Sequence, residues 1–264
     1  MSDIPPPARP GWAALTASQL RNVNRAYWRN PSAAFFTFAF PLMFLVIFTS
    51  LLGSGKVEIG PHLVHQSTYY VAAMAAYGLI SAAYVNVAIT IAFQRDSGIL
   101  KRVRGTPLPS SVYFGARVAH ALLVAVLLVA ITSAFGRLFY SADLPSGATL
   151  VKFGVMLLVG AAAFNSLAFA VTTIIPNADA SPAIVNATIL PLLFLSGIFI
   201  PIGNHAPAWI VWVARVFPVR HFAAGMQSGF IGTAFHWSDV LVVGAWGVAG
   251  LLLAVRGFSW EPRR

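Results

Sequence analysis

Six long apolar stretches alternate with polar segments along the chain. They run over Ala33–Leu52, Tyr69–Phe93, Val112–Phe139, Leu150–Ile175, Ala183–Ile200 and Val240–Val255. None of them carries a charged residue near its middle. A bilayer core needs about 20 mostly apolar residues in a helix, and a helix bonds its backbone polar groups internally. The pattern therefore predicts an all-α integral membrane protein with six transmembrane helices.

The segment before the first stretch has the pattern of an amphipathic helix over Thr16–Asn30. One face would carry Leu20, Val23 and Tyr27, and another would carry Arg21, Arg25 and Arg29. Thr16 and Gln19 have the spacing of a capping box at the start of a helix. A helix of this kind lies on the membrane surface with its apolar face in the inner leaflet. The alternative is a plain basic tail beside the membrane.

A second helical pattern lies in the loop between the second and third stretches. Asp96 or Ser97 would cap a short helix there, and Gly105 with Pro107 would end it. Its apolar residues Ile99, Leu100 and Val103 would cluster on one side, with basic residues around them. Such a helix could dock on a soluble partner, or the loop could be basic only to set the membrane orientation.

The segment between the fifth and sixth stretches is apolar but interrupted. Its runs are broken by Gly203, Pro207, Pro218, Gly225, Gly229 and Gly232. Each run is too short to cross a bilayer, and loose backbone cannot face lipid. We therefore expect short re-entrant helices that dip into the outer leaflet.

Composition and charge support a membrane protein oriented by its basic residues. The chain has 264 residues, of which 58% are hydrophobic and 9% charged, and its formal net charge is +10. With both ends on one side, that side holds Arg9, Arg21, Arg25, Arg29, Arg95, Lys101, Arg102, Arg104, Arg117, Arg256, Arg263 and Arg264. The other side holds only Lys56, Arg137, Lys152, Arg215 and Arg220. The positive-inside rule then places both termini in the cytoplasm, and no nucleic-acid partner is expected.

The residues give little support for catalysis or metal binding. Cysteine is absent, and no stretch holds paired carboxylates that would indicate a proton-coupled carrier. The run 53–56 resembles the end of a P-loop, but Ser50 and Val57 break the motif. Glu58, His62 and His65 have near-helical spacing, yet they lie in a polar loop where solvation is the simpler interpretation. We expect no catalytic site, no metal and no cofactor in this chain.

Small polar side chains inside the apolar stretches remain as candidates for a substrate path. They are Asn86, Thr90, Asn165, Ser166, Thr172, Asn186 and Ser196, together with Thr173 and Thr188. Side chains of this kind usually hydrogen-bond between helices, which is a purely structural role. The other interpretation is that they line a pathway for an amphipathic molecule.

Two motifs resemble those of ABC-2 type transporter permeases. Residues Arg95–Leu108 resemble the family segment E-x-G-T-L-x-R-L-R-x-T-P-L, and Leu192–Pro201 resembles its F-L-S-G-x-F-x-P stretch. Phe217–Phe222 stands where many members carry N-P-L-T-Y. In the first motif Asp96 replaces a glutamate and Ser97 occupies the second acidic position. The likeness extends over nearly the whole chain and is greatest to the daunorubicin-resistance type of drug-export permease.

The resemblance implies a half-size permease of an ATP-binding-cassette exporter. Two copies would pair, and a separate cytoplasmic ATPase would bind ATP and Mg²⁺. The contact with the ATPase would be a coupling helix containing Asp96, Ser97, Gly98, Ile99, Leu100, Lys101, Arg102 and Val103. The substrate would be drug-like or lipid-like; relatives with similar motifs export glycolipids or polysaccharides.

These observations predict one transmembrane domain over residues 1–264. It comprises a cytoplasmic tail and interfacial helix (1–32), a six-helix region (33–256) and a cytoplasmic tail (257–264). Arginine far outnumbers lysine, which is typical of a GC-rich genome and indicates a high-GC bacterium. A multi-pass protein of such an organism is expected in the cell (inner) membrane. The competing classes are a partner-independent channel or carrier and a membrane-embedded enzyme. The absence of charge at mid-membrane, of a visible inverted repeat and of a catalytic cluster argues against both.

Overall fold

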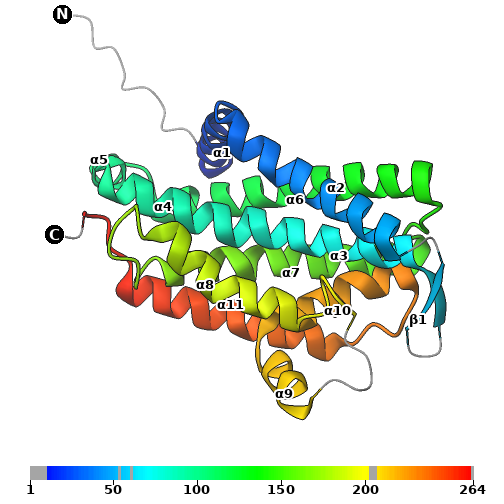
Figure 1. The fold of residues 1–264 in the computed structure, drawn as a ribbon. Coiled ribbons are helices and arrows are strands. Elements are labelled where there is room, and N and C mark those ends of the chain that lie inside the picture. The colour runs from blue at the N-terminus through cyan, green and yellow to red at the C-terminus, as the bar shows by residue number, and fades with distance from the viewer. Residues whose placement is uncertain (1–10, 53–54, 60–61, 202–206, 263–264) are drawn as a thin grey trace, which may run out of the picture.

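The structure, a computed structural model, describes residues 11–52, 55–59, 62–201 and 207–262. Its elements are α1 (Trp12–Trp28), α2 (Pro31–Leu52), β1 (Lys56–Ile59), β2 (His62–His65), α3 (Gln66–Ile80), the π-helix η1 (Ser81–Val85), α4 (Asn86–Asp96), α5 (Ile99–Arg104), α6 (Ser110–Tyr140), α7 (Gly147–Val171), α8 (Ser181–Leu195), α9 (Ala208–Val216), α10 (Pro218–Ile231) and α11 (Trp237–Gly257). Figure 1 shows the long helices side by side, with α5 and the end of α11 at one end of the bundle and β1 at the other.

Four helices in the described part of the chain are long and apolar enough to cross a membrane. They are Gln66–Asp96, Ser110–Tyr140, Gly147–Val171 and Trp237–Gly257. They correspond to the second, third, fourth and sixth predicted stretches, and the first of them joins α3, η1 and α4 without a break. The helical, membrane-spanning character of the chain is confirmed, whereas six crossings remain a prediction.

The first and fifth predicted stretches form apolar helices that fall short of that criterion. The apolar parts are Thr37–Leu51 of α2 and Ser181–Leu195, which is the whole of α8. A 15-residue helix is about 22 Å long, shorter than the hydrocarbon core of about 30 Å. The predicted end of the fifth stretch at Ile200 is wrong, because α8 stops at Leu195 and Gly197 turns the chain with φ +83°.

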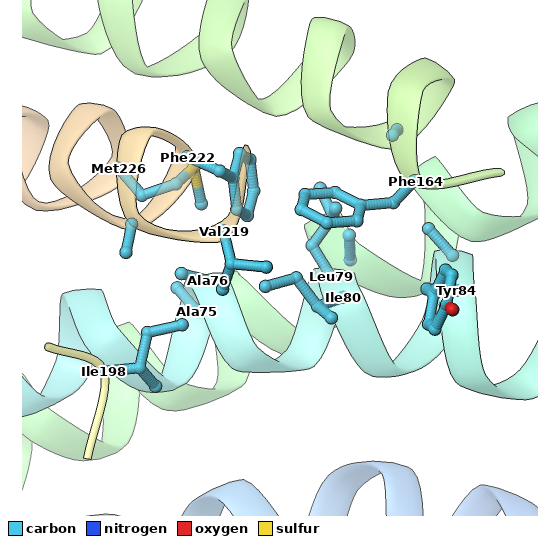
Figure 2. Close-up of a cluster of buried hydrophobic side chains, with 14 of the residues drawn as sticks. Ala75, Ala76, Leu79, Ile80, Tyr84, Phe164, Ile198, Val219, Phe222 and Met226 are labelled. Carbon is cyan, nitrogen blue, oxygen red and sulfur yellow. The ribbon is translucent and has the colours of Figure 1, made fainter. Parts of the chain in front are cut away.

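The core lies where α10 packs against α3 and α7. Figure 2 shows Phe222 and Met226 of α10 on one side of this core and Leu79 and Ile80 of α3 on the other, with the Phe164 ring of α7 next to the Phe222 ring. All five side chains are fully buried or nearly so. The rings of Phe164 and Phe222 lie 5.2 Å apart in an edge-on arrangement. The interrupted segment therefore contains two short helices, α9 and α10, and α10 is part of the core.

Small residues allow α7 and α11 to approach closely. A Cβ atom on Gly247 would lie 2.9 Å from the Cα atom of Ala163, and one on Gly250 would lie 2.9 Å from the backbone nitrogen of Leu167. Close contact through small residues is the usual way in which membrane helices associate. This contact fixes α11 against the centre of the bundle.

The loop between α2 and α3 contains regular structure that the sequence did not predict. The polar loop after α2 contains a two-stranded antiparallel sheet, with Lys56 opposite His65 and Ile59 opposite His62. The side chains of Glu58 and His62 lie outside the described part, as does the 53–54 stretch of the P-loop-like run. Among the side chains that are described, no group of three acidic, histidine or cysteine residues could hold a metal.

The amphipathic helix is α1, and it begins earlier than expected. It starts at Trp12, and the Thr16 hydroxyl donates a hydrogen bond to the Trp12 carbonyl oxygen within the helix, so Thr16 is not a cap. The expected faces are present: Tyr27 is buried, whereas Arg21 and Arg25 are exposed. The buried face of α1 packs mainly on α6.

Candidate coupling region and adjoining cavities

The loop expected to form one helix is a corner between two helices. Gly98 adopts a left-handed conformation, with φ +72° and ψ 8°, between the end of α4 and the start of α5. Glycine favours this conformation because it has no Cβ atom to clash. Asp96 is the last residue of α4, Ser97 follows it, and Gly98 precedes the first residue of α5, so the prediction that Asp96 or Ser97 caps this helix is wrong. The predicted end is right, because Gly105 terminates α5.

The two apolar neighbours on α5 have opposite environments. The side chain of Ile99 is 44% exposed, whereas that of Leu100 is fully buried in the core of the chain. Val103 is partly buried against the same core. The expectation that Leu100 forms part of an exposed apolar tip is wrong. The outward surface of α5 consists of Ile99 and the exposed basic residues Lys101, Arg102 and Arg104.

Arg95 joins the end of α4 to the connection between α7 and α8. Its side chain is 2% exposed. The guanidinium donates hydrogen bonds to the carbonyl oxygens of Thr172 (3.0 Å), Ile175 (2.9 Å) and Pro176 (3.3 Å). Because arginine holds five N–H donors in a rigid plane, one side chain can serve several carbonyl oxygens at a helix end. Arg95 thus satisfies backbone groups that the end of α7 leaves free.

Asp96 completes this junction from the other side. One carboxylate oxygen accepts a hydrogen bond from the Arg95 Nε atom at 3.2 Å. The other accepts one from the backbone nitrogen of Ala178, at 2.5 Å, in the same connection. The acidic residue at this place therefore ties the α4–α5 corner to the α7–α8 connection, so the two segments are held together.

Gln94 faces the opposite flank of α4 and contacts α6. Its side-chain oxygen accepts hydrogen bonds from the Tyr113 hydroxyl at 2.9 Å and from an Arg117 terminal nitrogen at 2.5 Å. The Arg117 guanidinium also lies 4.9 Å from the centre of the Tyr113 ring. This contact is a cation–π arrangement on top of the hydrogen bonds. Neighbouring residues of α4 therefore anchor the corner on both sides.

Two cavities flank α4 near this corner. The first, of about 310 Å³, lies between α1, α4, α5 and α6, and we name it the α1/α6 cavity. Its polar lining residues are Gln19, Asn22, Asn30, Asn86, Thr90, Gln94, Tyr113, Arg117 and His120. The second, of about 730 Å³, lies between α2 and the η1–α4 helix, and we name it the α2/α4 cavity. Asn86 and Thr90 line both, so these two candidates for a substrate path lie where the cavities meet.

The remaining candidates for a substrate path do not gather at these cavities. Asn165 and Ser166 line a separate cavity of about 500 Å³ between α6, α7 and α11. Thr172 and Ser196 are buried near the ends of their helices. Asn186 is half-buried on α8. The structure therefore distributes the predicted set over several regions.

The structural interpretation of these polar residues also needs correction. Asn165, Ser166, Thr172 and Ser196 each donate a hydrogen bond to a carbonyl oxygen three or four residues earlier in their own helix. These bonds do not join neighbouring helices. The structural interpretation is confirmed for Thr188 on α8, whose hydroxyl lies 2.7 Å from that of Tyr84 on η1 and so joins two helices.

The sequence interpretation missed Gln94, Arg117 and His120 as site residues. Arg117 was counted only as a basic residue that sets orientation. The sequence did indicate a site here, because Arg117 lies inside the third apolar stretch and His120 follows three residues later on the same helix face. Ionisable residues within a membrane span are usually functional.

Comparisons with known proteins now decide the family. The family model for the ABC-2 type transporter matches residues 14–231. The chain belongs to the ABC-2 type transporter family. This ABC-2 permease is 20% identical over 226 residues to "Putative transport permease YvfS" of Bacillus subtilis (strain 168), covering 86% of this chain and 89% of that protein. It is 22% identical over 223 residues to "Putative transport permease ycf38" of Pyropia yezoensis, covering 83% of this chain and 75% of that protein.

Membership fixes the general role of the chain. ABC-2 permeases are membrane transport subunits, and the ATPase that drives them is a separate chain. An ABC ATPase partner is thereby implied in general. The ABC-2 permease is a multi-pass membrane protein in keeping with its apolar helices.

Proposed function

We propose that this ABC-2 permease exports an amphipathic, drug-like or lipid-like molecule from the cytoplasm, using ATP hydrolysed by a separate ABC ATPase. Two permease copies form the pathway in a bacterial cell membrane. Six helices cross that membrane, and both termini lie in the cytoplasm. The basic residues of α1 and α5 at one end of the bundle support this orientation, because basic residues favour the cytoplasmic side.

The observation that carries the proposal is the construction of the α4–α5 corner. Ile99 and the basic residues of α5 face outward, while Leu100 fixes α5 to the core. Directly behind them, Arg95 and Asp96 bind the connection between α7 and α8. A partner that pushes on α5 would therefore act on α4 and on the connection between α7 and α8 at the same time. This arrangement suits the transmission of movement from an ATPase into the bundle.

The cavities beside α4 support an amphipathic substrate. Asn86 and Thr90 provide polar groups at the boundary between the α1/α6 and α2/α4 cavities. Most of the surface that the larger cavity exposes is apolar, although polar and apolar residues alternate in its lining. A molecule with one polar end and one apolar end matches such a pair of surfaces. A second copy of the permease would enclose the α2/α4 side, which one copy leaves open.

The test is a pair of matched substitutions in the α5 region. The permease is co-expressed with ABC ATPases of the same organism that lack membrane spans, and the complex is purified through the permease. Ile99→Asp should abolish co-purification of the ATPase, because an exposed apolar anchor in an interface is replaced by a charge. Co-purification is the deciding measurement, since Ile99 also lines both cavities and its replacement could reduce transport directly. Thr106→Asp, just beyond α5, adds the same charge and should leave co-purification unchanged.

Membrane abundance of the permease is measured in parallel, so that loss of folding is separated from loss of binding. If Ile99→Asp retains the ATPase, α5 is not the coupling helix. If no ATPase co-purifies with the unaltered permease and ATP drives no transport, the proposed function is wrong.

A further inference from the structure

Arg117 is a buried cation that forms no salt bridge with a carboxylate among the described residues. Its side chain is 6% exposed. One terminal nitrogen donates to Gln94 and to the Tyr113 hydroxyl, but the Nε atom has no hydrogen-bond partner among the described residues. Burying an ionised group without a countercharge costs several kcal/mol. The arrangement therefore favours an anion close to Arg117.

His120 lies beside Arg117 on the same side of α6 and is also incompletely bonded. Its side chain is 6% exposed, and its Nε2 atom has no hydrogen-bond partner in the described part of the chain. Both residues line the α1/α6 cavity. The lining that the structure describes contains amides and hydroxyls but no aspartate or glutamate. Arg117, His120 and the amide groups can thus all donate hydrogen bonds to an anionic ligand.

The depth of this cavity matches a membrane headgroup region. The 31 residues of α6 make a helix about 46 Å long, which exceeds the hydrocarbon core of about 30 Å. Arg117 follows the start of α6 at Ser110 by about 10 Å along the axis. That level corresponds to the polar boundary of the bilayer. An anionic group there could enter without crossing the hydrocarbon.

The α2/α4 cavity provides an apolar continuation. It shares Asn30, Asn86, Thr90, Gln94 and Ile99 with the α1/α6 cavity. Outside this shared set the lining consists of five apolar or aromatic residues, Phe40, Tyr77, Val85, Ile89 and Phe93, and three small polar ones, Thr37, Ser81 and Ser97. The α1/α6 cavity, at about 310 Å³, is at the small end of ligand pockets, which span roughly 300–1,000 Å³. The smaller cavity suits a headgroup, and the larger one suits an alkyl chain.

We propose that the two cavities together bind an amphipathic anion. Its phosphate or carboxylate group contacts Arg117 and His120 in the α1/α6 cavity, and its alkyl chain lies in the α2/α4 cavity. The exposed basic residues of α1 and α5 attract such a ligand to this end of the bundle. The inference rests on the proposed function, because the same two cavities are assigned there to the substrate, and it gives that substrate an anionic group. Binding is measured on the permease without ATPase or ATP, so a failure here is distinguishable from a failure of the ATPase test on α5.

The experiment measures lipid retention by the purified full-length permease in mild detergent. The protein is equilibrated with equal amounts of phosphatidylglycerol and phosphatidylcholine carrying the same acyl chains, and bound lipid is counted by native mass spectrometry. The unaltered permease should retain phosphatidylglycerol at least about tenfold over phosphatidylcholine, since tenfold corresponds to only about 1.4 kcal/mol. Arg117→Gln should reduce that preference to near one.

Two further variants separate the site from general charge and from folding. Arg25→Gln removes the same charge from an exposed position on α1 and should keep the preference. Ala26→Phe keeps every polar group but fills part of the α1/α6 cavity, which Ala26 lines, and should reduce phosphatidylglycerol retention. Inorganic phosphate at the concentration of the lipid should not displace phosphatidylglycerol, because it lacks the chain.

Three results would overturn the proposal. Equal retention of the two lipids by the unaltered permease would exclude a site for an anionic headgroup. An equal loss with Arg25→Gln and Arg117→Gln would indicate general surface charge. Displacement by inorganic phosphate at equal concentration would show a simple anion site rather than one for an amphipathic molecule.

Discussion

Two buried arginines, Arg95 at the end of α4 and Arg117 near the start of α6, differ in how completely their N–H groups are hydrogen-bonded. Arg95 is paired with Asp96 and donates to three carbonyl oxygens between α7 and α8. In the part of the chain that the structure describes, Arg117 donates only to Gln94 and Tyr113, and its Nε atom has no partner. The first side chain fills a closed structural junction, whereas the second borders a cavity.

The difference separates a structural role from a binding role. Where a buried charge makes all its hydrogen bonds within the protein, the charge and its partners stabilise the fold together. Removal of any one of these groups leaves the others buried without a partner. A buried charge that faces a cavity is completed by something from outside the chain. Burial alone therefore does not identify a functional arginine; the unsatisfied donors and the adjoining space do.

The largest effect is expected at the structural junction. Arg95→Gln removes the partner of Asp96 and leaves three carbonyl oxygens without a donor, which should cost about 3–5 kcal/mol of stability. Arg95→Lys should also lower the stability, because an ammonium group cannot reproduce the planar arrangement of guanidinium N–H donors. Thermal unfolding of the purified permease measures this loss. Arg102→Gln, at an exposed position on α5, is the control and should unfold like the parent chain.

A somewhat smaller effect is expected where α5 is fixed to the core. Leu100→Ala should destabilise the permease by about 2–5 kcal/mol, since it removes a fully buried side chain and leaves a cavity. Ile99→Ala, one residue earlier and 44% exposed, should change unfolding very little. Unfolding curves for the two variants compare them directly. Equal destabilisation by both would contradict the assignment of Leu100 as the buried residue of the pair.

The turn between α4 and α5 should show the smallest loss. Gly98→Ala places a Cβ atom in open space, so the penalty comes only from the left-handed backbone and should be about 1–2 kcal/mol. Gly98→Asn should lose less, because asparagine tolerates this conformation better. Gly98→Val should lose more than Gly98→Ala, because β-branched residues rarely adopt a positive φ. If alanine and asparagine destabilise equally, backbone strain is not the reason for glycine here.

The sequence predicted the long helices well because their apolar stretches exceed the bilayer thickness. Four stretches correspond to helices whose ends differ by at most four residues from the expected bounds; three helices are longer at both ends, whereas α7 stops at Val171, before the expected Ile175. The fifth ended too late because Ser196 and Gly197 are compatible with an apolar run, while only the fold shows that the chain turns there. Hydropathy measures composition along the chain, and it does not register a local change of backbone direction.

The candidate site was predictable only in part. The α5 segment was recognised, but six residues give too short a pattern to decide which of Ile99 and Leu100 faces the core. Arg117 and His120 become a site only through α1, which is distant in sequence and packs over them. Tertiary neighbours of that kind leave no periodic signal.

The comparison of the two arginines is tested most directly by thermal unfolding in two lipid environments. The parent permease, Arg95→Gln and Arg117→Gln are each placed in nanodiscs of phosphatidylcholine, with or without phosphatidylglycerol. Arg95→Gln should lower the melting temperature in both environments and keep the increase that phosphatidylglycerol gives. Arg117→Gln should melt close to the parent in phosphatidylcholine and lose that increase. An undiminished increase in Arg117→Gln would contradict the account, as would a parent-like melting temperature for Arg95→Gln.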